Sequence, residues 1–108
     1  MKTIDIMLKI LEKLERSLDE NIPDLSDISA NSLGITQEKR SYILEMMQDA
    51  GLIKDVNFSF ADCNRAPIIT YDRDMNITLS GIMFLEDNTT TAKIIKAAKL
   101  LKDTIPGI

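Results

Sequence analysis

The hydrophobic period of the chain changes at Gly51, and this change constrains the fold more than any other feature. Before it, Thr36 is suited to cap a helix that runs to about Ala50, because apolar residues recur there at helical spacing. After it, the stretch LIKDVNFSF alternates as a strand does, with one face made of Lys54, Val56, Phe58 and Phe60. A capped helix that passes directly into a strand predicts a mixed α+β domain.

Two more helices are expected before this one. Residues 3–21 have an amphipathic pattern that Thr3 is suited to cap, and the apolar stripe comprises Ile4, Met7, Leu8, Leu11, Leu14 and Leu18. Ser26 is suited to cap a second, short helix, which Gly34 would close as a C-terminal glycine.

A second strand and two further helices are expected after the first strand. PIITY, residues 67–71, has the composition of a strand, with ADCNRA as the loop before it and DRDMN as the turn after it. Thr78 is suited to cap a helix that begins near Leu79. Residues 90–105 are expected to form a C-terminal amphipathic helix, whose apolar stripe comprises Ile94, Ile95, Ala98, Leu101 and Ile105.

The expected order is that of a winged helix-turn-helix protein. The predicted fold class is therefore α+β and mostly helical, with three helices, a β-hairpin wing and two C-terminal helices. A chain of 108 residues is long enough for one core, so residues 1–108 are expected to form a single domain.

The run ITLSGIMFLEDN, residues 77–88, carries a family resemblance. It is similar to the segment "apolar-Thr-x-x-Gly-x-x-aromatic-Leu" that follows the wing in many small bacterial winged-helix proteins, and the matching residues are Ile77, Thr78, Gly81, Phe84 and Leu85. In layout the whole chain resembles the YjcQ-like family, small winged-helix proteins of Gram-positive bacteria and their prophages. The resemblance implies the fold, and a regulatory role of phage or prophage type.

A winged-helix protein inserts its third helix into the major groove of DNA. At about 100° per residue, the core side of this helix would hold Ile43, Leu44, Met46, Met47 and Ala50, and the outer side Glu38, Ser41, Tyr42, Glu45 and Asp49, with Gln37 and Gln48 along one edge. The residues expected to contact double-stranded DNA are Gln37, Lys39, Arg40, Ser41 and Tyr42 on the helix, Arg65 and Arg73 near the wing, and Lys93 and Lys96 in the tail. The three outer carboxylates would be repelled by phosphate and count against this interpretation.

The net charge of −4 also weakens the case for nucleic acid, because affinity for DNA comes mainly from Lys and Arg. The charge is uneven: the last segment carries four lysines against one aspartate, and the rest of the chain is acidic. No apolar run approaches the roughly 20 residues that cross a bilayer, so no membrane association is expected. The single cysteine, Cys63, favours a reducing cytoplasm.

No catalytic centre, cofactor or metal site is expected, and no small-molecule substrate is indicated. The chain has no histidine, the commonest general base at neutral pH. Asp72, Asp74 and Asn76 match the first, third and fifth positions of an EF-hand calcium loop. However, Ile77 and Met83 stand where that loop requires glycine and glutamate, so a polar turn is the better interpretation.

The two terminal helices have broad apolar faces. Ile6 and Ile10 lie outside the main stripe of the first helix, and the last helix offers a stripe suited to a homodimer interface, comprising Ile94, Ala98, Leu101 and Ile105. The alternative is that these faces pack within one chain. Two functions therefore remain open: a non-catalytic DNA-binding regulator, and a protein-interaction module that uses the winged-helix fold without nucleic acid.

Overall fold

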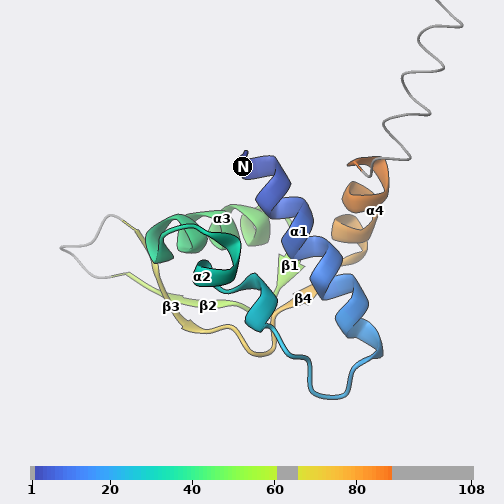
Figure 1. Cartoon of the computed structure of the whole chain (residues 1–108), viewed down its shortest axis with the longest axis horizontal. Coiled ribbons are helices and arrows are strands. Elements are labelled where there is room, and N and C mark those ends of the chain that lie inside the picture. The colour runs from blue at the N-terminus through green and yellow to red at the C-terminus, as the bar shows by residue number, and fades with distance from the viewer. Residues whose placement is uncertain (1, 61–65, 89–108) are drawn as a thin grey trace, which may run out of the picture.

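The computed structural model describes residues 2–60 and 66–88, and Figure 1 shows how their elements are arranged. The helices are α1 (Thr3–Arg16), α2 (Ala30–Leu33), α3 (Gln37–Asp49) and α4 (Leu79–Asn88), with 3₁₀ turns η1 (Ser17–Asp19) and η2 (Ser26–Ile28). The strands are β1 (Ile53–Lys54), β2 (Asn57–Ser59), β3 (Ile68–Tyr71) and β4 (Asn76–Ile77). The expected α+β, mostly helical class is confirmed. The helix expected at 90–105 lies outside the described residues.

The N-terminus of α1 lies one residue earlier than expected. The backbone N–H of Lys2 donates to Oδ2 of Asp5 at 3.2 Å, and the carbonyl of Lys2 accepts from the N–H of Ile6. Lys2 is therefore the N-cap, and Thr3, expected in that role, is the first helical residue. An acidic side chain three residues after the cap satisfies the cap's own N–H, and Asp5 occupies that position.

The buried face of α1 also differs from the expected stripe. Four side chains at its centre are at most 1% exposed: Ile6, Ile10, Leu11 and Leu14. Ile4 and Leu18, expected inside the core, are 37% and 51% exposed. Each fully buried aliphatic side chain contributes roughly 1.5–3 kcal/mol, so Ile6 and Ile10 are core residues and not a spare apolar surface. The face contacts α3, β4 and α4.

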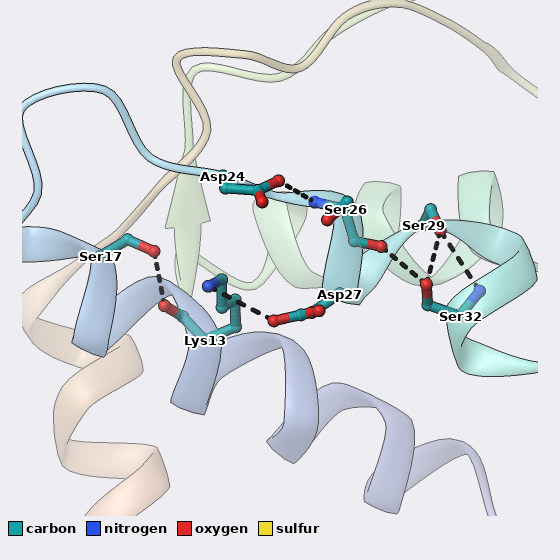
Figure 2. A network of polar contacts seen from close by, with 7 residues as sticks. All are labelled: Lys13, Ser17, Asp24, Ser26, Asp27, Ser29 and Ser32. Atoms are coloured by element: carbon teal, nitrogen blue, oxygen red, sulfur yellow. Dashed lines mark hydrogen bonds and ion pairs between the residues drawn. The ribbon is translucent and has the colours of Figure 1, made fainter.

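A polar network ties the segment before α2 to α1, as Figure 2 shows. Nζ of Lys13 lies 3.5 Å from Oδ2 of Asp27, and the N–H of Ser26 donates to Oδ1 of Asp24 at 3.0 Å. The bond from the Ser26 N–H is the main reason that the pKa of Asp24 lies below its ordinary value, with smaller contributions from the Ser26 hydroxyl and from Lys13.

The short helix α2 is capped by Ser29 and not by Ser26, the expected cap. Oγ of Ser29 accepts the N–H of Ser32 at 3.2 Å, which satisfies one of the free donors of the first turn. Ser26 instead opens η2, and its carbonyl accepts the hydroxyl of Ser32 at 2.7 Å. Gly34 ends α2 with φ of 70°, as expected for a C-terminal glycine.

Both ends of α3 lie where the sequence predicts. Oγ1 of Thr36 accepts the N–H of Lys39 at 3.1 Å, and Gly51 follows the helix with φ of 78°. The core side holds three residues that are at most 1% exposed, Ile43, Leu44 and Met47. Met46 and Ala50 were also expected there, but both are exposed, because the buried face extends instead toward Arg40 and Ser41.

The stretch expected as one strand after Gly51 is divided into two. β1 pairs antiparallel with β4, and β2 pairs antiparallel with β3, with Phe58 opposite Ile69 and Ser59 opposite Ile68. Asp55 lies between the two strands with φ of 67°, a left-handed conformation that redirects the chain. The single face expected for LIKDVNFSF therefore does not form: Val56 is buried, whereas Lys54 and Phe60 are exposed. The strand expected at PIITY is confirmed as β3.

Gln48 of α3 holds the chain at this division. Its side-chain amide donates to the carbonyl of Val56 at 2.9 Å and accepts the N–H of Val56 at 2.9 Å. The side-chain amide thus pairs with both backbone groups of Val56, as a neighbouring strand would, although Val56 belongs to neither β1 nor β2. Gln48, considered above as an outward-facing group, is a structural residue that attaches the hairpin to the C-terminal half of α3.

The Thr-x-x-Gly segment joins α4 to the end of α3. The N–H of Thr78 donates to the carbonyl of Leu52 at 3.1 Å, and its hydroxyl donates to the carbonyl of Gly51. The same hydroxyl accepts the N–H of Gly81 at 3.0 Å, so Thr78 caps α4 as predicted. Gly81 lies against the backbone of Leu52, where a Cβ atom would stand 2.2 Å from the carbonyl oxygen. Only glycine allows this approach.

Candidate functional site

A groove separates the N-terminal half of α3 from the beginning of β3. Its volume is about 360 Å³, and it is lined by Gln37, Glu38, Ser41 and Tyr42 of α3 and by Ala66, Pro67, Ile68 and Ile69. One wall of the groove is therefore the N-terminal half of α3, and the other is the segment 66–69, which leads into β3. Several residues of α3 that were expected to contact DNA line this groove. The opposite wall, residues 66–69, was not expected to take part in a site.

Arg40 does not belong to this surface. Its side chain is 7% exposed, and its Nε donates to the carbonyl of Ile28 at 2.8 Å. One terminal nitrogen, NH1, lies 3.1 Å from Oδ2 of Asp72, in the turn between β3 and β4. The expectation that Arg40 reaches outward to phosphate is therefore wrong, because its guanidinium group is buried and joins α3 to two other segments.

The other expected contact residues of α3 are divided between surface and interior. Gln37 and Lys39 are exposed, Tyr42 is half-buried, and Ser41 is 3% exposed with its hydroxyl donating to the carbonyl of Gln37 at 3.0 Å. Ser41, expected on the outer side, is thus turned inward. The groove brings together Gln37, Ser41 and Tyr42, whereas Lys39 does not line it.

The exposed surface of α3 is acidic. Glu38 and Asp49 are exposed and Glu45 is half-buried, whereas Lys39 is the only basic residue of this helix that is exposed. The described residues as a whole carry 8 Lys and Arg against 15 Asp and Glu, a net charge of −7. The potential around this surface therefore favours cationic ligands.

The groove lies against the beginning of β3. Successive side chains of a strand point to opposite faces of the sheet, yet the groove is lined by four consecutive residues, 66–69. Ile68 is 42% exposed, whereas Ile69 packs against the core. The groove therefore touches an exposed and a core-packed side chain of the same strand. Among the described residues β3 pairs with β2 alone, so its other edge carries no strand.

The polar turn between β3 and β4 lies away from the groove. Arg73 is exposed there, beside Asp72 and Asp74. Asp72 accepts from Arg40, and the N–H of Met75 donates to its carbonyl at 3.2 Å, as in a tight turn. Across residues 2–60 and 66–88, no three potential His, Cys, Asp or Glu ligands gather as a metal ion requires.

Several expected residues lie outside the described ranges, namely Cys63, Arg65, Lys93, Lys96, Ile94, Ala98, Leu101 and Ile105. The dimer interface expected at Ile94, Ala98, Leu101 and Ile105 therefore stays a prediction. Part of its argument is wrong, however, because Ile6 and Ile10, taken as spare apolar surface on α1, fill the core.

The sequence interpretation did not assign the β3 wall of the groove. A signal was present: Pro67, Ile68 and Ile69 are apolar at consecutive positions, so both faces of the strand carry apolar side chains. A hairpin with one face in water alternates apolar and polar residues instead. The excess apolar residue, Ile68, is the one that the groove exposes.

Comparison with known proteins gives one match. The sequence model of the family described as YjcQ protein matches residues 8–104, which is most of the chain. Neither a curated protein nor a solved structure shows significant similarity to the chain.

Proposed function

We propose that this chain, which belongs to the YjcQ protein family, is a non-catalytic winged-helix module that binds another protein and does not bind DNA. The order of elements supports the winged-helix interpretation: α2 and α3 follow each other through the short connection 34–36, and the β2–β3 hairpin comes directly afterwards. In this interpretation α3 is the recognition helix and the hairpin is the wing. The absence of histidine from the sequence supports a non-catalytic role.

The observation that carries the choice of partner is the burial of Arg40. A helix that reads the major groove needs cations beside its base-reading residues, because phosphate contacts provide most of the affinity. Arg40 is the only arginine of α3, and it is bound to Ile28 and Asp72. What remains on the exposed surface is one lysine beside three carboxylates. Each carboxylate brought to a phosphate adds repulsion where a DNA-binding helix needs attraction.

The DNA-binding alternative is tested by making α3 more basic. The wild-type protein and the variant Glu38→Lys/Glu45→Lys/Asp49→Lys are titrated with a labelled mixed-sequence duplex at roughly 50 mM salt, and fluorescence anisotropy reports binding. We expect no saturable binding by the wild type and salt-sensitive binding by the triple variant, because only the variant presents cations on the recognition helix. Circular dichroism checks that both proteins are folded.

A wild-type protein that binds the duplex and loses affinity in Lys39→Glu and Arg73→Glu would overturn the proposal in favour of DNA. These two residues are exposed, so their substitution tests phosphate contact directly. Arg40→Glu is unsuitable for this purpose, because it would place a carboxylate against Asp72 and damage the fold whatever the ligand.

A further inference from the structure

We infer that the groove between α3 and β3 binds an extended peptide segment of a partner protein, which adds to the edge of β3 as a strand and places a lysine or arginine beside Glu38. This inference rests on the proposed function and specifies its site and its ligand. Peptides that enter a sheet edge next to a helix gain affinity from main-chain hydrogen bonds and specificity from the pockets beneath alternate side chains.

The edge of β3 supplies the main-chain groups. Within the described residues the sheet has the two strands β2 and β3, with Phe58 opposite Ile69 and Ser59 opposite Ile68. Each strand of such a pair has a second edge whose N–H and C=O groups lack a ladder partner. The groove is lined by the consecutive residues 66–69, of which Ile68 and Ile69 belong to β3, so a ligand in the groove lies against the beginning of this strand. An extended peptide is the ligand whose backbone groups repeat at the same spacing.

Two hydrogen-bonded contacts join the base of the hairpin to α3. Near its beginning, Arg40 binds Asp72 in the turn that follows β3. Near its end, Gln48 binds both backbone groups of Val56, just before β2. Both contacts flank the pair Asn57–Tyr71 at the base of the hairpin, and the groove lies beyond them toward the hairpin tip. The hairpin is thus attached to α3 at its base, and the groove is present without a ligand. A preformed site avoids the free energy of ordering that a flexible surface spends on binding.

The chemistry of the lining selects the peptide. Ile68 is 42% exposed and offers an apolar contact, and Tyr42 contributes a half-buried ring from the opposite wall. Glu38 is exposed and makes no ion pair with another described residue. The net charge of −7 over the described residues attracts a basic segment during approach. An apolar residue flanked by lysine or arginine is complementary to this lining.

The groove wall sets the length of the contact. Its four consecutive residues, 66–69, extend over about 13 Å at the usual rise of about 3.3 Å per residue. A peptide of about six residues therefore covers this wall with one residue beyond each end.

The probe is a positional-scanning library of peptides of about six residues, presented to the full-length protein and read by fluorescence anisotropy. We expect the strongest binders to carry β-branched residues and at least one lysine or arginine. Amide NMR spectra recorded with the best peptide should change at residues 37–42 and 66–71. N-methylation of the peptide at every second position should weaken binding about tenfold, and methylation at the intervening positions should have little effect, because only alternate N–H groups face β3.

Two matched variants separate the site from general electrostatics. Glu38→Lys should weaken lysine-containing peptides about fivefold and reverse the preference toward acidic ones, whereas Glu45→Lys makes the same charge change outside the groove and should alter affinity less than about twofold. Ile68→Thr keeps the strand propensity of a β-branched residue and removes apolar contact, so it should weaken binding in a stable protein. Thermal unfolding confirms that each variant is folded.

The inference is overturned if no library peptide binds, or if N-methylation has no positional effect. It is also overturned if the amide changes fall on another surface, such as Leu79 and Met83 of α4, which are 73% and 61% exposed. If the amide changes fall on α4, the peptide still binds, and the proposed function stands although the groove is not the site. If the wild type binds duplex DNA and no peptide, the proposed function fails as well.

Discussion

Replacing Gly81 with alanine tests how α4 is joined to α3. A Cβ atom on this residue would lie 2.2 Å from the carbonyl oxygen of Leu52 and 2.7 Å from Cγ1 of Ile77, whereas ordinary contacts begin near 3.4 Å. The helix would therefore have to move by about 1 Å, because the carbonyl belongs to backbone that cannot rotate away. That movement strains the bonds of Thr78 to Leu52 and Gly51.

The magnitude follows from three effects. Overpacking of a close contact costs about 1–3 kcal/mol, and each of two strained hydrogen bonds costs about 1 kcal/mol. Alanine recovers about 1 kcal/mol of helix propensity relative to glycine. The expected net loss is about 3 kcal/mol in the free energy of unfolding, which corresponds to a fall in Tm on the order of 10 °C.

Urea unfolding followed by circular dichroism measures this loss. Ser80→Ala, one residue earlier on the exposed side of α4, is the matched control and should change stability by less than about 0.5 kcal/mol. Thr78→Val removes the hydroxyl without the steric contact and should cost about 2 kcal/mol, whereas Thr78→Ser should retain most of the stability. A Gly81→Ala protein as stable as the wild type, or stabilised by its better helix propensity, would refute the close approach of α4 to Leu52.

Three further outcomes are expected. Arg40→Met should lower the free energy of unfolding by about 2 kcal/mol, a value below that of a fully buried pair because its partner carboxylate is one-third exposed; an unchanged urea midpoint would contradict the structural role. Gln48→Ala should cost about 1–2 kcal/mol and speed hydrogen exchange at the amide of Val56, and exchange as slow as in the wild type would show that the side chain does not hold this residue. In a carboxyl NMR titration, Asp24 should titrate below its ordinary pKa because of the Ser26 N–H. Because folding lowers this pKa, the ionised Asp24 stabilises the fold at pH values above the ordinary pKa, and this stabilisation is lost as the pH falls through the lowered pKa. A raised pKa would contradict this expectation.

Much of the fold could be predicted where the signal is local. The Thr36 cap, the stop at Gly51 and the Thr78 cap were all correct, because a hydroxyl at a helix start and a glycine at its end act on neighbouring backbone. The division at Asp55 could not be predicted. The alternation of LIKDVNFSF continues through it, and only pairing with distant residues makes Ile53 part of one sheet and Phe58 part of another.

The buried sector of α1 shows a second limit. Apolar residues occupy most of the circumference of this helix, so spacing does not choose between the stripe of Ile4 and Leu18 and the stripe of Ile6 and Ile10. The choice depends on where α3, β4 and α4 lie, and α4 is more than 60 residues away in the chain.

The candidate site was predicted in part. Gln37 and Tyr42 were expected on the outer side of α3, and both line the groove, whereas Ser41, expected beside them, is buried. Arg40 falls toward the apolar side of the helix in the sequence pattern, and it was expected to reach phosphate because a long side chain can extend its charge to the surface. Its burial requires a carbonyl from Ile28 and a carboxylate from Asp72, and neither is close to it in the sequence.

The two attachments of the hairpin to α3 also decide what kind of selectivity a ligand would meet. Arg40 and Gln48 hold the base of the hairpin, next to the pair Asn57–Tyr71, whereas residues 66–69 line the groove nearer the tip. The separation of helix and strand is therefore fixed at the base and can widen toward the tip by a bend of the hairpin, with both bonds intact. Natural partners should accordingly differ little in size at the residue nearest the base and more at the residues nearest the tip.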